Sequence, residues 1–343
     1  MSTEREPAES ETAERVTIYD VAKHAEVAPS TVSRAFSRPG RVSAATHAKV
    51  MASAKALGYR SAPPPAQERT QRNNRLGIEV PDLTNPYFAE LISGMQEAVK
   101  GLDHMLLLLD SVEDEERERH SLLSAVEVVD GIVLSGSRLS DATLNHLTKR
   151  IPVVVMNRRV AGLDSVTPDY EHGMGQATAH LAENGIRTVT YVAGPVNSWS
   201  DGERWRTART AARNHGIQID RQGPYAPTAT GGEQAFEDLQ STLTHAVICY
   251  NDLIALGFMV SALRAGVKVP TELSVIGHDD IPLARFVGGG LTSLATPKRA
   301  QGRAAVERLI RRIENPSAHR TPVEGSLPVR LVVRGSTGHR RTY

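Results

Sequence analysis

Seven short apolar runs, separated by longer stretches with helical periodicity, constrain the fold of this sequence more than any other feature. The runs occupy residues 75–80, 105–110, 131–136, 152–157, 188–194, 245–250 and 273–279. Continuous apolar strands that alternate with amphipathic helices form parallel sheets covered by helices on both faces. About 270 residues would make a very large single sheet. The pattern therefore predicts two α/β lobes with parallel sheets.

The residues that directly follow these runs are candidates for a binding site. Ligands of open α/β folds bind beyond the carboxyl ends of the strands. Several runs end in polar or turn-forming pairs: Pro81-Asp82, Asn157-Arg158, Gly194-Pro195, Asn251-Asp252 and Asp279-Asp280, with Asp110 closing another run. We expect these residues to meet at one edge of each sheet.

The N-terminal part of the chain is organised differently. Residues 1–14 hold five Glu and one Arg, so we expect an acidic, disordered tail. Residues 15–60 hold eight Lys or Arg against two acidic residues, and such a basic segment is typical of a nucleic-acid-binding module.

Three short helices are predicted within residues 15–60. Thr17 can cap the first helix with Asp20 three residues on, Pro29 suits the first position of the second, and Ser43 opens a third that Gly58 closes. A short turn between the first two helices is typical of a helix-turn-helix unit. We assign its small core to Val21, Ala22, Val27, Val32, Val50 and Leu57.

Composition and missing motifs exclude several classes of protein. No apolar run approaches the roughly 20 residues that span a bilayer, and the N-terminus lacks the apolar stretch of a secretory signal, so we expect a cytoplasmic protein. Cys249 is the single cysteine, and the twelve histidines show no metal-binding spacing, so neither metal nor cofactor is predicted. The sequence has no GxxxxGK[ST] or GxSxG motif, and adjacent Asp279 and Asp280 point apart rather than across a scissile bond. We predict no enzyme and no catalytic residue.

The segment VTIYDVAKHAEVAPSTVSRAFSRPGRVSAATHAKVMASAKALGY resembles the DNA-binding head of the lactose-repressor (LacI/GalR) family of bacterial transcription regulators. The resemblance continues in the family's order through LGIEVPDLTNPYF, HLAENGIRTVTYVAGP, ICYNDLIALG, LSVIGHDD and PVRLVVRGSTG. It covers nearly the whole chain after residue 15. It implies a helix-turn-helix head on a two-lobed core like that of periplasmic binding proteins.

For the head, the resemblance implies that the helix beginning at Pro29 lies in the major groove of DNA, where base edges are distinguishable. Pro29, Ser30 and Arg34 match base-facing positions, and a guanidinium can bond guanine O6 and N7 together. The positions that hold phosphates or line the head match Thr17, Tyr19, Thr31, Ser33, Ser43, Thr46 and Tyr59. Thr17 and Ser43 are equally explained as helix caps alone.

The proline-rich segment 61–74 departs from the family. Members of the family usually carry a hinge helix with Ala-Arg and a leucine that opens the minor groove. The matching positions here hold Pro65, Ala66 and Glu68, so the resemblance predicts an atypical hinge without that wedge. Arg69 and Arg72 would then supply only attraction to the DNA backbone. A plain spacer is the alternative.

For the core, the resemblance implies a site for a small, sugar-like effector between the lobes. The matching residues are Tyr87, Phe88, Asn157, Arg204, Asn251 and Asp279, and Trp199 is a candidate surface on which a sugar ring could stack. Carboxylate, amide and guanidinium groups that converge on a cleft can both accept from and donate to sugar hydroxyls. Core packing is the alternative for Phe88 and is favoured for Trp205, and helix capping is the alternative for Asp280. The usual Gly-aromatic pair after Arg204 reads Thr207-Ala208, which leaves the aromatic side of the site open.

The sequence therefore predicts a homodimeric repressor of a near-palindromic operator, with half-sites about 10 bp apart. We expect the head at 15–60, the linker at 61–74 and the core at 75–343. Within the core we expect an N-lobe of about 75–168 plus 297–325 and a C-lobe of about 169–296 plus 326–343. The charge run EDEERERH (113–120) is expected to form one solvated helix face.

Three alternatives stay open. They are a regulator that answers to a protein partner, an exported sugar-binding protein, and a sugar-metabolising enzyme on the same scaffold.

Overall fold

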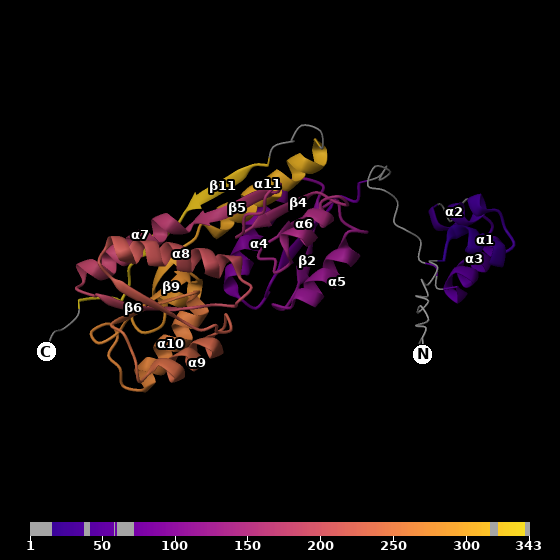
Figure 1. Cartoon of the computed structure of the whole chain (residues 1–343). Coiled ribbons are helices and arrows are strands. Elements are labelled where there is room, and N and C mark those ends of the chain that lie inside the picture. The colour runs from indigo at the N-terminus through magenta and orange to yellow at the C-terminus, as the bar shows by residue number, and fades with distance from the viewer. Residues whose placement is uncertain (1–15, 38–41, 58, 60–71, 316–321, 340–343) are drawn as a thin grey trace, which may run out of the picture. The chain divides into compact units, whose positions relative to one another are not determined.

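The computed structural model describes residues 16–37, 42–57, 59, 72–315 and 322–339. The predictions for the acidic tail, Gly58, Pro65, Ala66, Glu68 and Arg69 lie outside these residues. The chain divides into two compact units, residues 1–68 and 69–343, which we call the head and the core (Figure 1).

The head contains the three predicted helices, α1 (Ile18–His24), α2 (Pro29–Ser37) and α3 (Ala44–Ala56). Thr17 and Asp20 form a capping box at the start of α1, and the Ser43 hydroxyl accepts from the backbone N–H of Thr46 at the start of α3. Pro29 is the first residue of α2, as predicted. Four of the six residues assigned to the small core, Val21, Ala22, Val32 and Val50, are buried in it together with Ala25, Ala35 and Ala54, and Val27 and Leu57 are half-buried and pack against it.

The first sheet of the core has six strands in the order β11-β5-β4-β3-β1-β2, and all of its pairings are parallel. Its strands are β1 (Arg75–Val80), β2 (Met105–Asp110), β3 (Gly131–Leu134), β4 (Val153–Met156), β5 (Asp164–Asp169) and β11 (Glu324–Pro328). We call this sheet and its helices the N-lobe. The helices are α4 (Pro86–Val99), α5 (Glu115–Ala125), α6 (Asp141–Leu147) and α11 (Lys298–Glu314).

The second sheet has the order β12-β10-β9-β8-β6-β7, with only the β10–β12 pair antiparallel. Its strands are β6 (Thr188–Val192), β7 (Gln218–Gln222), β8 (Ala246–Cys249), β9 (Ser274–Asp279), β10 (Thr292–Ala295) and β12 (Arg330–Val332). With α7 (Tyr170–Glu183), α8 (Trp199–Asn214), α9 (Ala229–Leu239) and α10 (Asp252–Arg264) it forms the C-lobe. The fold is the predicted two-lobed α/β core with a helical head.

The chain passes between the lobes three times: after β5, between β10 and α11, and between β11 and β12. Each sheet therefore receives its last strand from the C-terminal segment. In the N-lobe, α4 and α11 lie side by side and approach closely at Gly302, where an added Cβ would lie 2.1 Å from the carbonyl oxygen of Leu91. Glycine at this position is what allows the two helices to touch.

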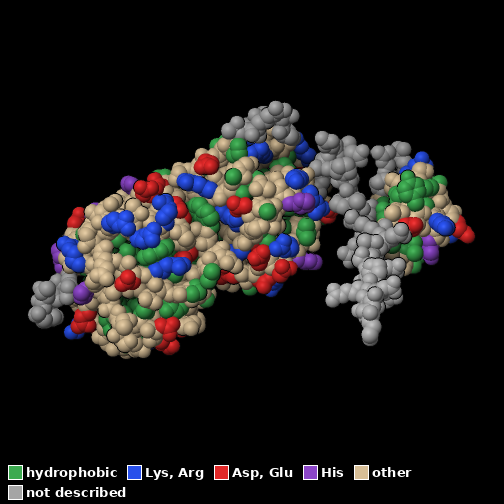
Figure 2. All heavy atoms as spheres, viewed as in Figure 1, with side chains coloured by type: hydrophobic (Ala, Val, Ile, Leu, Met, Phe, Trp, Pro, Cys, Tyr) green, Lys and Arg blue, Asp and Glu red, His purple; other side chains and the backbone are tan. Residues whose placement is uncertain are grey.

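The edge strand β2 differs from the expectation of burial on both faces. Its sequence is MLLLLD, yet Met105 is 62% exposed and Leu107 and Leu108 are also exposed. Elsewhere on the face of the core seen in Figure 2, Lys and Arg side chains are interspersed with Asp and Glu. No helix in the described parts of the chain is long and apolar enough to cross a membrane.

Candidate functional site

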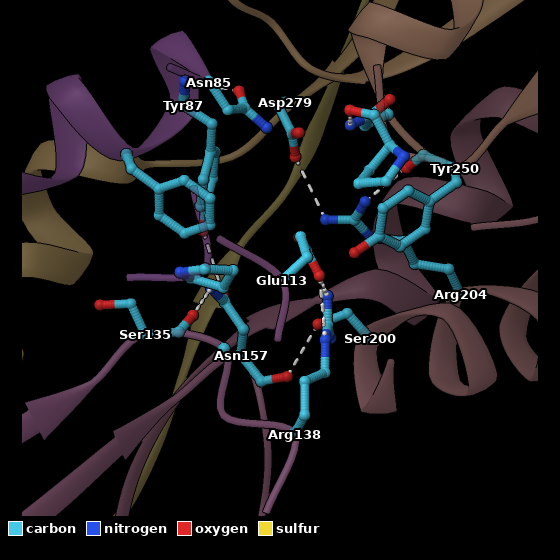
Figure 3. A pocket seen from close by; sticks show the side chains of 15 residues that line it. Asn85, Tyr87, Glu113, Ser135, Arg138, Asn157, Ser200, Arg204, Tyr250 and Asp279 are labelled. Atoms are coloured by element: carbon cyan, nitrogen blue, oxygen red, sulfur yellow. Dashed lines mark hydrogen bonds and ion pairs between the residues drawn. The ribbon is translucent and has the colours of Figure 1, made fainter. Parts of the chain in front are cut away.

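A small polar cavity lies between the lobes, at the carboxyl ends of the strands of both sheets (Figure 3). Its volume is about 40 Å³, little more than one water molecule occupies, because the surrounding side chains bond to one another across it. Its lining is Pro81, Asn85, Tyr87, Phe88, Glu113, Ser135, Gly136, Arg138, Asn157, Ser200, Arg204, Pro227, Tyr250, Asn251 and Asp279.

Six of the seven predicted effector residues line this cavity: Tyr87, Phe88, Asn157, Arg204, Asn251 and Asp279. The seventh, Trp199, is not among the lining residues. It is the first residue of α8 and lines a separate, shallower groove beside the cavity. Phe88 is also part of the hydrophobic core. Trp205 packs against the buried Tyr191, with ring centroids 5.6 Å apart, in agreement with the core packing favoured for Trp205.

The C-lobe half of the cavity is built on the ion pair between Arg204 and Asp279. Both side chains are buried, and Arg204 Nη2 lies 3.1 Å from Asp279 Oδ1. The guanidinium also donates to the Tyr250 carbonyl and lies over the rings of Tyr170 and Tyr250, at 5.2 and 4.8 Å from their centroids. Burial raises the pKa of Asp279 to about 6, although Arg204 and Lys298 lower it. This pair presents a donor and an acceptor to the cavity.

The N-lobe half contains a second ion pair, between Arg138 and Glu113. Arg138 Nη2 lies 2.5 Å from Glu113 Oε2, and its Nε donates to the same oxygen at 3.1 Å. Burial lowers the pKa of Arg138, but Tyr250 and Glu113 raise it by more. Tyr250 belongs to the C-lobe, so this electrostatic interaction acts between the two lobes across the cavity.

These contacts contradict the prediction of one solvated helix face at 113–120. Glu113 precedes α5 and lines the cavity, and Glu118 is only 1% exposed. Glu118 accepts from the backbone N–H of Arg138 at 2.9 Å, which helps to position the loop that carries the arginine. Burial, and then the charge of Glu118, raise the pKa of neighbouring Glu79 in β1. A charge run in the sequence does not show which of its members a neighbouring loop will cover.

Asn157 connects the cavity to the segments that cross between the lobes. Its Oδ1 accepts from the Tyr87 hydroxyl at 3.1 Å and from Gln301 Nε2 at 2.8 Å, and Gln301 lies on α11 directly after a crossing. Its carbonyl accepts from the Ser200 hydroxyl at 2.9 Å, which is a hydrogen bond between the lobes. A ligand that displaced these bonds would act directly on the relative position of the lobes.

The backbone around the cavity adopts conformations that side-chain-bearing residues rarely take. Glu113, Asn157 and Asp279 have φ values of 56°, 57° and 106°. Such residues persist only where their surroundings hold them, and they gather at ligand clamps and switch regions. All three line the cavity, each just beyond the end of a strand or at its last residue.

Asn251 and Asp280, which belong to the Asn251-Asp252 and Asp279-Asp280 pairs, both make structural contacts. Asn251 caps α10 through Ile254 N–H at 2.9 Å and donates to the Pro227 carbonyl at 3.0 Å. Asp280 forms an ion pair with Arg334 at 2.5 Å, and the short helix that follows it has no side-chain cap. The capping alternative for Asp280 is therefore wrong.

On the head, the second helix presents its predicted base-facing residues to solvent. Pro29, Ser30 and Arg34 are exposed, as are Ser33 and Tyr19. Val32 and Ala35 on the opposite face are buried in the head's core. The remaining predicted contacts, Thr17, Thr31, Ser43, Thr46 and Tyr59, are exposed or half-buried. Tyr59 also packs edge-on against Phe36, with ring centroids 5.7 Å apart.

Two parts of the chain match known protein families. Residues 17–61 match the family described as "Bacterial regulatory proteins, lacI family", and residues 178–337 match the "Periplasmic binding protein-like domain". The HTH-type transcriptional repressor CytR of Escherichia coli K12 is 31% identical over 332 residues, which cover 94% of this chain and 96% of CytR. The chain belongs to the LacI family.

Solved LacI-family structures share the fold. The transcriptional regulator CelR in complex with cellobiose matches with a TM-score of 0.69 and 26% identity, covering 94% of this chain and 100% of CelR. A LacI-family regulator from Enterococcus faecalis V583 with bound ribose matches with a TM-score of 0.69 and 30% identity, over 77% of this chain and 98% of that one.

Within this LacI-family core, sequence reasoning missed the cavity-lining residues Tyr250, Glu113 and Arg138. Tyr250 supplies an aromatic ring to the cavity, and Glu113 and Arg138 come from loops after β2 and β3. The signal for Tyr250 was present, because it lies between the end of β8 and Asn251. Arg72, predicted to attract DNA, donates instead to the Ile313 carbonyl at 3.2 Å. Among the described residues, no group of three or more His, Cys, Asp or Glu side chains is placed to hold a metal ion.

Proposed function

We propose that this protein is a transcriptional repressor whose affinity for its operator is controlled by a small polyhydroxylated effector, a sugar or a compound containing one. The head, taken as residues 15–60, would bind DNA, and residues 75–343 would bind the effector and dimerise, with 61–74 as the linker. The relatives support the DNA-binding part, since CytR is a named transcriptional repressor. The solved relatives with cellobiose and ribose support the effector class.

The observation that carries the effector proposal is the arrangement of two ion pairs that face one cavity, one from each lobe. Arg204 with Asp279, and Arg138 with Glu113, offer donors and acceptors side by side. A sugar hydroxyl donates to a carboxylate and accepts from a guanidinium, so vicinal hydroxyls fit such pairs. The ring of Tyr250, which lines the cavity, adds the apolar surface that ligand pockets require.

The effector would act by replacing contacts that now join the lobes. A cavity of about 40 Å³ is too small for a sugar ring, so binding requires the lobes to move and the Ser200–Asn157 and Arg138–Tyr250 interactions to be exchanged. An effector regulates only if it binds the two arrangements differently, typically by about 1–3 kcal/mol. Operator affinity would then change by about 5- to 150-fold.

We propose that the protein acts as a homodimer on a near-palindromic operator. The exposed apolar side chains of β2 support this, because a second copy of the chain would remove them from water. Each head would bind one half-site, and Arg34 would read a guanine in the major groove.

The test is a titration of the purified protein on DNA that flanks its own gene, followed by fluorescence anisotropy with and without a panel of sugars. We expect one sugar to change operator affinity in the wild type and to have no effect on Arg204→Ala, which should still bind DNA. The matched control is Arg209→Ala, an exposed arginine on the same helix. Operator binding that no sugar changes would refute the effector proposal and leave the DNA-binding proposal standing.

A further inference from the structure

A groove of about 430 Å³ lies beside the polar cavity and is lined from both lobes. We call it the Trp199 groove. The N-lobe contributes Glu115, Arg138, Leu139, Ser140 and Arg158, and the C-lobe contributes the loop before α8 and Trp199 itself. Its volume is within the range of about 300–1,000 Å³ typical of small-molecule sites, whereas the cavity is far below that range.

The groove and the cavity are adjoining parts of one cleft. Arg138 lines both of them. Ser198 lines the groove, and its hydroxyl lies 3.1 Å from the hydroxyl of Tyr250, which lines the cavity. A ligand that extended past Arg138 and Tyr250 would leave the cavity and enter the groove.

The groove is lined by the ring of Trp199 and by the guanidinium-bearing side chain of Arg158. Trp199 is half-buried, and neighbouring Val196 is 75% exposed. Arg158 has a side chain only 12% exposed, and its Nη atoms donate to the carbonyls of Ser137 and Leu139 and to the carboxylate of Asp141. Its Nε is buried and has no hydrogen-bond partner among the described residues. The bonds of the Nη atoms hold Arg158 against the N-lobe side of the groove.

We infer that the effector is a glycoside with two rings, of which the polyhydroxylated ring occupies the cavity and the second ring lies on Trp199 in the groove. This inference rests on the proposed function and narrows its effector class. The second ring is either another sugar or a planar base, since both stack on an indole. Because both lobes line the groove, binding of the second ring would also depend on the relative position of the lobes.

The two tryptophans make the inference directly measurable. The chain contains only Trp199 and Trp205, and Trp205 packs against Tyr191 in the C-lobe core. A Trp205→Phe variant leaves Trp199 as the single tryptophan, so its fluorescence reports the groove alone. The probes are matched pairs: D-glucose with cellobiose, D-galactose with lactose, and D-ribose with cytidine and adenosine.

We expect at least one two-ring compound to bind about tenfold more tightly than its single-ring partner and to change Trp199 fluorescence. Trp199→Ala should remove that preference and leave single-ring binding unchanged. Trp199→Phe, which keeps a flat ring, should restore most of the preference, and a merely structural role would not give this pattern. Whether the sugar or the nucleoside pairs show the preference identifies the second ring.

Two outcomes would overturn the inference in distinguishable ways. A monosaccharide that binds as tightly as its two-ring partner, with Trp199 fluorescence unchanged, refutes the groove subsite and leaves the proposed sugar effector intact. If none of the compounds binds while operator binding persists, the proposed effector class fails, and the subsite fails with it.

Discussion

Replacing Asp279 with asparagine should stabilise the core at neutral pH while it weakens the proposed effector site. Burial raises the pKa of this carboxyl to about 6 in the folded protein, against an ordinary value of 3.8. The folded state therefore holds the proton more tightly than the unfolded chain does. The stability that this proton contributes is fully present below pH 3.8 and is lost as the pH rises through about 6.

The magnitude follows from the same two values. The interval from 3.8 to about 6, at 1.36 kcal/mol per pKa unit, corresponds to a loss of about 3 kcal/mol by pH 8. Asparagine is neutral at every pH and keeps an oxygen that can accept from Arg204 Nη2. We therefore expect wild type and Asp279→Asn to have similar free energies of unfolding at pH 4, and the variant to be more stable by about 3 kcal/mol at pH 8.

Urea unfolding followed by tryptophan fluorescence at pH 4, 6 and 8 measures this difference. Asp220→Asn is the control, because Asp220 is exposed on the edge strand β7. A variant that is less stable than wild type by several kcal/mol at pH 8 would refute the reasoning. That result would mean that the attraction between Asp279 and Arg204 outweighs the cost of burying the carboxylate.

Three further substitutions test other parts of the molecule. Arg34→Ala should weaken operator binding by about 1–3 kcal/mol and leave binding to unrelated DNA nearly unchanged, as measured by anisotropy on both DNAs. Leu108→Asp places a charge among the exposed side chains of β2 and should shift sedimentation from dimer to monomer; an unchanged dimer would locate the interface elsewhere. Gly302→Ala should cost about 1–3 kcal/mol of unfolding free energy because its Cβ would meet the carbonyl of Leu91, whereas Gly175→Ala, with nothing within 4 Å, should not.

The sequence predicted the strands that lie in mainly apolar runs and missed β5, whose burial depends on polar contacts. All seven apolar runs contain a strand of the core. By contrast, β5 reads DSVTPD, and its burial depends on Arg312, which bonds both carboxylate oxygens of Asp164, and on Arg308, which donates to the Ser165 carbonyl. Those arginines lie about 150 residues away in the sequence, so no local pattern shows that they cover this strand.

For the cavity, the rule that ligands bind at strand ends found Asn157, Asn251 and Asp279, because each lies at or just after the end of a predicted strand. It could not find Arg138, whose position depends on Glu113 and on the hydrogen bond between its backbone N–H and Glu118. Trp199 was expected beside the sugar ring but begins a helix that places it in the adjoining groove. The positions of Arg138 and Trp199 therefore depend on tertiary structure that the composition of the sequence does not show.

The order in which the strands join the two sheets has a consequence for how the protein is made. β5 ends at Asp169, but its outer neighbour β11 ends at Pro328, about 160 residues later. At roughly 5–20 residues per second, a ribosome needs roughly 10–30 s to synthesise that interval. The head is therefore complete and able to meet DNA well before either sheet has its last strand. A message cut short after β10 would yield a polypeptide with a finished head and two unfinished sheets, and such a product would lack the means to answer an effector.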